Sequence, residues 1–100
     1  MHGPGIELDA LLTLQQLERA LALSPGWVSE RVAAGLIDPA AGDAAGDPTA
    51  WRFDAFVLRR ARAMVRVERG FDAVPELAAL VADLEDEIAA LRSRLARFGR

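Results

Sequence analysis

Residues 13–39 read TLQQLERALALSPGWVSERVAAGLIDP, and this stretch decides the fold that the sequence predicts. Thr13 can cap a helix, and Gln16 three residues later completes a capping-box pattern. Leu14, Leu17 and Leu21, with Ala20, recur at helical spacing, so the pattern predicts a short helix from Leu14 to about Ala22.

A second short helix follows after a tight connection. Ser24 is a good N-cap, and Pro25 suits the first helical position because it has no N–H to satisfy there. Val28 and Val32 give this helix an apolar face, and Gly35 is the residue type that ends helices. Two short helices so connected form a helix-turn-helix pattern.

The segments on either side of this pattern are less regular. Residues 1–12 are expected to be a tail or a short strand, and residues 40–50, rich in Ala, Gly and Asp, a flexible loop. Trp51-Arg52-Phe53 then predicts a short strand that closes this loop as a wing, with Trp51 in the core. Asp54 caps a third helix that should end at Gly70. Its expected inward face is Phe56, Val57, Ala61, Met64 and Val65.

The last helix, from about Val74 to Phe98, carries the most regular pattern. Its apolar residues are spaced 4, 3, 4, 3, 4 and 3, and we call them the heptad seam: Leu77, Val81, Leu84, Ile88, Leu91, Leu95 and Phe98. β-Branched residues at one seam position and leucine at the other favour a two-stranded parallel coiled coil, bridged by Glu87 and Arg92. The same stripe could also pack within the chain. We expect the upstream part to join the core and the later part to form a homodimer. The expected dimer residues are Leu84, Ile88, Leu91, Leu95 and Phe98.

Composition excludes several classes of function. The chain has 100 residues, enough for one small domain, with no cysteine and a single histidine, His2. Thiolate metal sites, disulfides and histidine general bases are therefore not expected, nor is a cofactor. The carboxylates of the last helix project in different directions around the helix axis, so they would not lie on two sides of a substrate. No enzyme is therefore predicted. No secretory signal or bilayer-spanning apolar run is visible, which predicts a cytoplasmic protein.

The charge pattern argues against DNA as the partner. Residues 1–50 hold two arginines and seven acids, and the second helix offers Gly26, Trp27, Ser29 and Glu30 where a DNA-reading helix needs cations. Only residues 52–69 are basic, with six arginines and two acids, and they keep backbone contacts with DNA open.

Two acidic surfaces are instead available for a protein partner. The first comprises Glu18, Trp27, Glu30 and Asp38; the second comprises Asp83, Asp86 and Glu87. The sequence does not choose between them. Trp27 is open to two interpretations, a core residue or an aromatic anchor at an interface.

The combined pattern resembles a known family. Thr13–Leu17, Ser24–Val28, Gly35–Pro39 and Trp51–Phe53 occur in the order found in MerR-like winged helix-turn-helix proteins, and the chain is most similar to their chaperone-modulator branch, CbpM, over residues 12–98. The resemblance implies a mostly α fold, with a tail over residues 1–12, a winged helix-turn-helix domain over residues 13–70 and a coiled-coil helix over residues 71–100.

The resemblance also implies a function. Members of this family bind the J-domain of a DnaJ-like co-chaperone, CbpA, and stop it from stimulating its DnaK-type chaperone. Two alternatives remain: a small MerR-like DNA-binding transcriptional regulator that uses the third helix, and an assembly module whose main feature is the coiled coil.

Overall fold

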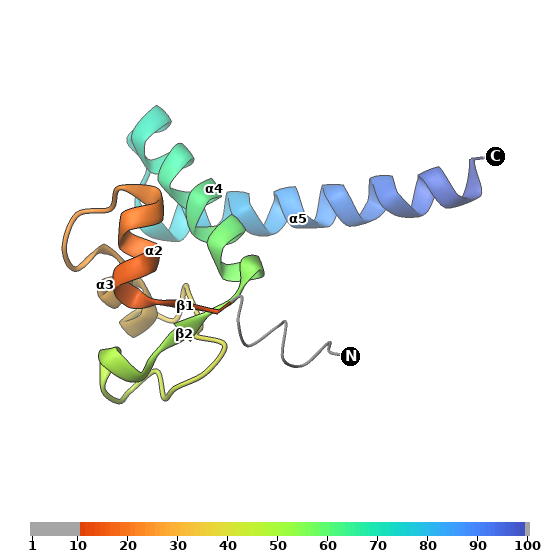
Figure 1. The fold of residues 1–100 in the computed structure, drawn as a ribbon. Coiled ribbons are helices and arrows are strands. Elements are labelled where there is room, and N and C mark those ends of the chain that lie inside the picture. The colour runs from red at the N-terminus through yellow and green to blue at the C-terminus, as the bar shows by residue number, and fades with distance from the viewer. Residues whose placement is uncertain (1–10, 100) are drawn as a thin grey trace, which may run out of the picture. The chain divides into compact units, whose positions relative to one another are not determined.

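The computed structural model describes residues 11–99, in which helices predominate (Figure 1). The elements in chain order are β1 (Leu12–Thr13), α2 (Leu14–Leu21), α3 (Trp27–Ala33), the 3-10 helix η1 (Pro48–Ala50), β2 (Arg52–Phe53), α4 (Ala55–Phe71) and α5 (Pro75–Phe98). The predicted mostly helical chain with a long C-terminal helix is confirmed. Of the expected tail or strand over residues 1–12, only Leu11 and Leu12 lie within the described residues.

The described chain forms two compact units that divide between Arg62 and Ala63, inside α4. In the first unit, β1 and β2 pair antiparallel, with Leu12 opposite Phe53 and Thr13 opposite Arg52. The side chains of β2 and the residue before it alternate, because successive strand residues face opposite sides: Trp51 and Phe53 are buried, and Arg52 is half-buried. The predicted core position of Trp51 is confirmed.

Helix α2 begins as predicted. Thr13 accepts a hydrogen bond from the Gln16 backbone N–H at 3.1 Å, and Gln16 accepts one from the Thr13 N–H at 2.9 Å. The helix ends at Leu21, and its C-cap, Ala22, has a φ of 52°. The Leu23 N–H reaches back to the Glu18 carbonyl at 2.9 Å and satisfies one of the last free acceptors. A residue other than glycine in this left-handed conformation costs stability.

The start of α3 differs from the prediction. The helix begins at Trp27, and its N-cap is Gly26, whose φ of 88° and ψ of −11° suit the third position of a type II turn. Pro25 occupies the second position of that turn, which the Trp27 N–H closes on the Ser24 carbonyl at 3.1 Å. The prediction of Ser24 as N-cap and Pro25 as first helical residue was therefore wrong, because a Pro-Gly pair favours this turn.

Helix α3 ends where the sequence predicts. Gly35 has a φ of 75°, and the Gly35 and Leu36 N–H groups donate to the Val32 carbonyl at 3.0 Å and to the Arg31 carbonyl at 2.9 Å. This double closure is a Schellman motif, in which glycine takes the left-handed position without steric cost. The side chain of Arg60 also stabilises the backbone just after α3, since its Nε donates a hydrogen bond to the Leu36 carbonyl at 2.9 Å.

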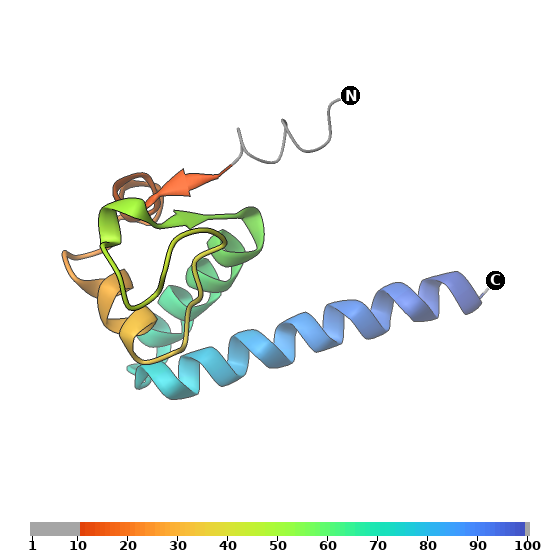
Figure 2. The same ribbon diagram turned by 90° about the horizontal axis from the view of Figure 1, so that it is seen from below.

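The loop over residues 40–50, whose course Figure 2 shows, is exposed, and specific hydrogen bonds hold it in place. Ala41 bridges to Arg52, and Asp43 and Asp47 each accept a hydrogen bond at 3.0 Å from a backbone N–H two residues further on. The bond from Thr49 stabilises the charged carboxylate and lowers the pKa of Asp47 below its ordinary value of 3.8. The expectation of a flexible loop missed these local aspartate turns.

Helix α4 is capped as predicted, with Asp54 accepting from the Val57 N–H at 2.9 Å. Two predictions about it were wrong. Phe56 is 50% exposed, because it lies about a quarter turn from the buried row that begins at Val57. The helix also continues through Gly70 to Phe71, and Asp72, the residue after it, has a positive φ of 52°. Aspartate tolerates this conformation better than most residues.

Both units contain buried apolar residues. In the first they are Leu17, Val28, Val32, Ile37, Trp51, Phe53, Val57 and Ala61; in the second they are Met64, Val65, Val67, Ala78, Ala79 and Ala82. Helix α5 thus buries small alanines on one side, and its apolar seam stays outside. The expectation that the upstream seam joins the core was wrong for Leu77, which is 49% exposed, and Val81 is only half-buried.

Candidate functional site

The first acidic surface lies in the first unit and centres on α3. Trp27 and Glu30 are three residues apart on this helix and so lie on neighbouring parts of its surface. The Glu30 side chain is 80% exposed, and Trp27 is half-buried. Asp38 is exposed beyond the end of α3, and Glu18 is half-buried on α2. Of the four residues predicted for this surface, Trp27 and Glu30 are thus placed together on α3, whereas Glu18 and Asp38 come from the segments before and after it.

Arg31 joins the two α3 residues of this surface. Its guanidinium carbon lies 3.9 Å from the centre of the Trp27 ring, and Nη1 donates to the Trp27 carbonyl at 2.9 Å. Nη1 also lies 3.7 Å from Oε1 of Glu30. Arg31 is only 7% exposed, so its charge is used within the helix and is withdrawn from the surface. The arginine-over-aromatic contact follows from a spacing of four residues, which places two side chains on one helical face.

The sequence interpretation missed this role of Arg31. The spacing of Trp27 and Arg31 was a usable signal, since pairs four residues apart meet on a helix. Trp27 was interpreted either as a core residue or as an aromatic anchor at an interface, and neither describes it fully. The guanidinium of Arg31 covers one face of its ring, and part of the residue stays accessible.

Glu18 occupies a different setting from Glu30. It lines an open hollow together with Thr13, Leu14 and Gln15, which lie at the start of α2, and with Thr49 from η1. A hollow edged by a carboxylate and hydroxyl groups can accept a basic or hydrogen-bonding side chain.

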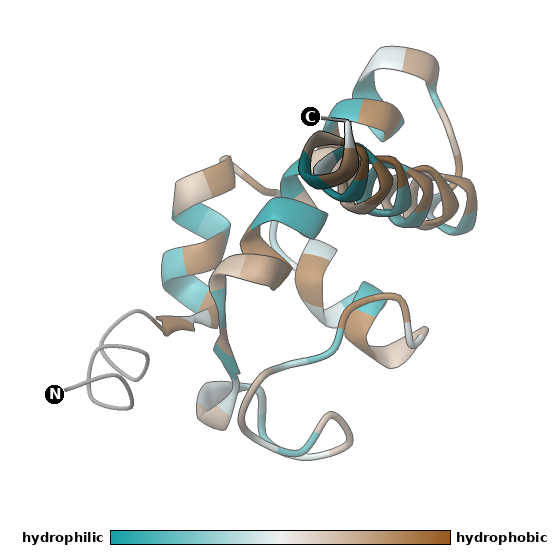
Figure 3. Ribbon diagram, turned by 90° about the vertical axis from the view of Figure 1, so that its right-hand side faces the viewer, coloured by the Kyte–Doolittle hydropathy of each residue, from teal (hydrophilic) through white to brown (hydrophobic). Residues whose placement is uncertain are grey.

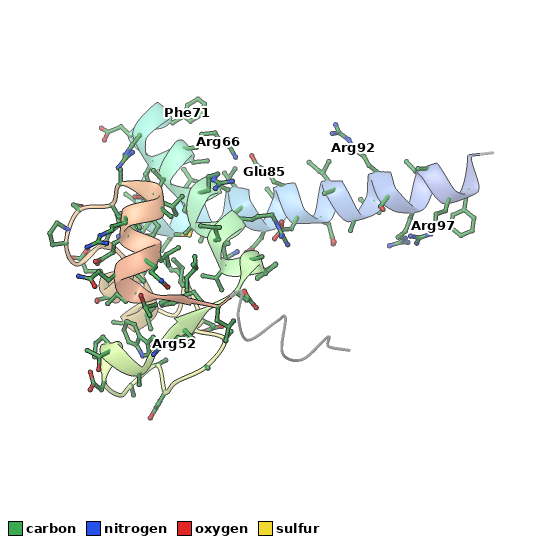
Figure 4. The ribbon with its side chains drawn as sticks, in the orientation of Figure 1. Arg52, Arg66, Phe71, Glu85, Arg92 and Arg97 are labelled. Atoms are coloured by element: carbon green, nitrogen blue, oxygen red, sulfur yellow. The ribbon has the colours of Figure 1, made fainter. Side chains whose placement is uncertain are left out.

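The second acidic surface lies on α5 in the second unit. Asp83, Asp86 and Glu87 are exposed, and their spacing of three and four residues places them on one side of the helix. Glu85 points to another side and accepts a hydrogen bond from Nη2 of Arg66 on α4 at 2.7 Å, as Figure 4 shows. That ion pair links α4 to α5, whereas the three predicted acids lie on the exposed side of α5.

The five residues predicted for dimerisation lie together along α5 and are exposed. Leu84, Ile88 and Leu91 are about half exposed, Leu95 is 68% exposed and Phe98 is 80% exposed. Figure 3, which looks nearly along this helix, shows apolar segments recurring between polar ones over its length. From Asp86 to Gly99 every residue is exposed, so this part of the helix has no packing partner among residues 11–99.

The described residues offer little for metal or membrane chemistry. No group of three or more His, Cys, Asp or Glu side chains within residues 11–99 is arranged to hold a metal ion. None of the helices in the same range is both long and apolar enough to cross a bilayer. Compared with known protein families, with curated proteins and with solved structures, the chain matches none of them.

Proposed function

We propose that this protein is a chaperone modulator of the CbpM type, which binds the J-domain of a DnaJ-like co-chaperone and blocks its stimulation of the DnaK-type chaperone. In this proposal α2, the turn and α3 form a MerR-like helix-turn-helix, and the β1–β2 pair with the loop over residues 40–50 forms its wing. The mechanism is occlusion and needs no cofactor or covalent step.

The burial of Arg31 is the observation that carries the proposal. A helix that reads DNA must present cations to phosphates and donors to base edges. Helix α3 uses its one arginine to cover Trp27 and presents the carboxylate of Glu30 instead. A surface of this sign repels a phosphate backbone and attracts a basic helix, which J-domains use to dock onto the DnaK-type chaperone.

We assign the contact to the first acidic surface, because it combines carboxylates with the partly accessible Trp27. Aromatic side chains often anchor protein interfaces, and acidic groups around such an anchor steer a basic partner into place. The second surface on α5 holds acids but no aromatic residue, which favours a lesser role in binding.

The test is a titration of the full chain with the J-domain of the cognate co-chaperone. Glu30→Arg should weaken binding by about tenfold or more, because it reverses the charge nearest the anchor. Asp86→Arg, with the same change in net charge, should leave the affinity within about twofold. Glu76→Arg, at an exposed acid of α5 outside both surfaces, is the matched control.

Three results would count against this assignment. Loss of binding with Asp86→Arg alone would move the contact to α5. Unchanged binding in both reversals would refute the electrostatic interface. Failure of the unaltered chain to bind the J-domain, or to lower J-domain-stimulated ATP hydrolysis by the DnaK-type chaperone, would refute the function.

A small DNA-binding regulator is the second candidate, favoured by the exposure of Arg59 and Arg62. These residues are three apart on α4 and so lie on one side of it. Arg52 and Arg60 are less suited to phosphate, since each donates to backbone carbonyls of the first unit. Duplex binding that persists at physiological salt and is lost in an Arg59→Glu, Arg62→Glu double variant would favour this candidate.

A further inference from the structure

An open hollow lies between the start of α2 and η1, within the first unit. Thr13, Leu14, Gln15 and Glu18 line it together with Thr49 of η1. Its volume is about 430 Å³, which is within the range of small-ligand pockets and leaves room for a whole side chain of a partner. Glu18 is the charged residue of this lining, so the lining carries a negative charge.

Both walls of the hollow are held in place by hydrogen bonds within the unit. On the α2 side, Thr13 and Gln16 each accept a hydrogen bond from the other's backbone N–H, at 3.1 and 2.9 Å. In η1, the Thr49 N–H donates to Asp47 at 3.0 Å, and the Thr49 carbonyl accepts from Nη1 of Arg52 at 3.0 Å. A site whose walls are fixed before binding loses little conformational entropy when a ligand enters.

The carboxylate of Glu18 is left for a partner. Glu18 is half-buried, and no side chain within residues 11–99 forms a hydrogen bond or an ion pair with its carboxylate. Arg52, labelled in Figure 4, is bonded to the backbone beside the hollow, since its Nη1 donates to the carbonyls of Thr49 and Trp51. The start of α2 carries a partial positive charge of about +0.5, which is half the size of the charge on Glu18. The sum favours a cation in the hollow.

The lining of the hollow suits arginine better than lysine. Acceptor oxygens come from the Glu18 carboxylate, the Gln15 amide and the Thr49 hydroxyl, which belong to two separate elements. A guanidinium offers five N–H donors spread over a plane, whereas an ammonium is a compact and strongly hydrated charge. Leu14 is half-buried and lines the same hollow, so it can cover the apolar stem of an arginine.

We propose that this hollow binds one arginine side chain of the partner's basic helix. The guanidinium pairs with Glu18, and the stem lies against Leu14. The identity of the partner rests on the proposed function, in which a J-domain presents this helix, whereas the preference of the hollow for a guanidinium does not. A contact at Glu18 in addition to the one on α3 fixes the orientation of the partner, because two separate contacts leave it less freedom to rotate.

The first test uses a small probe and needs no partner. N-Acetylarginine amide at millimolar concentration should shift the backbone amide NMR signals of the lining residues Leu14, Gln15, Glu18 and Thr49. The citrulline analogue, which has the same shape without the charge, should leave these signals in place, as should inorganic phosphate. Glu18→Gln, which keeps the helix propensity of this position, should abolish the arginine shifts, and Glu76→Gln, the same change at an exposed acid of α5, should keep them. Absent shifts with the arginine probe, or equal shifts with citrulline, would overturn the proposal, and shifts with phosphate alone would mark an anion site instead.

The second test places the arginine in the J-domain. Glu18→Gln should weaken the binding of the full chain to the cognate J-domain about fivefold, since it removes one charge-assisted hydrogen-bonded pair. When the arginines of the J-domain's basic helix are replaced one at a time by glutamine, one of them should cost nothing further in the Glu18→Gln variant, because both changes break the same pair. Additive losses for every arginine, or coupling to a lysine, would overturn the assignment. If the J-domain does not bind at all while the arginine probe still shifts the lining residues, the proposed function fails and the preference of the hollow for a guanidinium stands.

Discussion

Helices α3 and α5 handle their charged and apolar residues in opposite ways. In α3, Val28 and Val32 are buried and the single arginine is folded back onto Trp27, so the helix is complete within its own unit. In α5, only small alanines are buried, and the large apolar residues remain exposed along more than half of its length. The comparison shows that α3 buries its large apolar residues, whereas α5 keeps an apolar face that no described residue covers.

The largest expected effect concerns Trp51, at the centre of the first unit. Trp51 is 3% exposed, its Nε1 donates to the Asp43 carbonyl at 2.8 Å, and its ring meets Phe53 edge-on at 6.2 Å. Trp51→Ala should lower the free energy of unfolding by about 3–5 kcal/mol, because it leaves a large cavity and removes that hydrogen bond. Chemical denaturation measures this loss.

Leu95→Ala is the matched change in α5. At a protein concentration low enough to keep the chain monomeric, it should alter the free energy of unfolding by less than about 0.5 kcal/mol, since Leu95 is 68% exposed. If Leu95→Ala lowered the free energy of unfolding as much as Trp51→Ala does, the apolar face of α5 would contribute to the fold as the core of the first unit does.

A smaller effect is expected at Arg31. Arg31→Met should destabilise the first unit by about 1–2 kcal/mol, since it removes the bond to the Trp27 carbonyl and the contact with the ring. Weak binding to duplex DNA, measured by fluorescence anisotropy, should not change, because the guanidinium is withdrawn from the surface. If DNA binding fell while the free energy of unfolding stayed constant, Arg31 would contact phosphate. Helix α3 would then present its arginine at the surface, and it would no longer differ from α5 in this respect.

The smallest expected effect is a gain in stability. Ala22→Gly should stabilise the chain by about 0.5–1 kcal/mol, because Ala22 has a φ of 52°, which glycine adopts without a Cβ clash. Thermal unfolding monitored by circular dichroism checks the sign. Ala33→Gly, at the last residue of α3 where the backbone is still helical, is the control and should destabilise the chain instead.

The sequence by itself determined the elements whose causes are local. The capping box of Thr13 and Gln16, the left-handed Gly35, the Asp54 cap and the helix from Val74 onward depend on residues within a turn or two of each other. Errors arose where two local signals competed. Pro25-Gly26 formed a turn and not the start of a helix, and α4 continued through Gly70, where it was expected to end, to Phe71.

Only the tertiary structure decided which side of each helix is covered. Spacing shows that apolar residues share a face, but burial depends on what lies against that face, and this involves segments distant in the chain. Hence α5 buries Ala78 and Ala82 and leaves Leu77 and Leu84 outside, and Phe56 is exposed beside the buried Val57. The tertiary structure also decided the burial of Arg31, because its low exposure depends on the packing around α3 as well as on its spacing from Trp27.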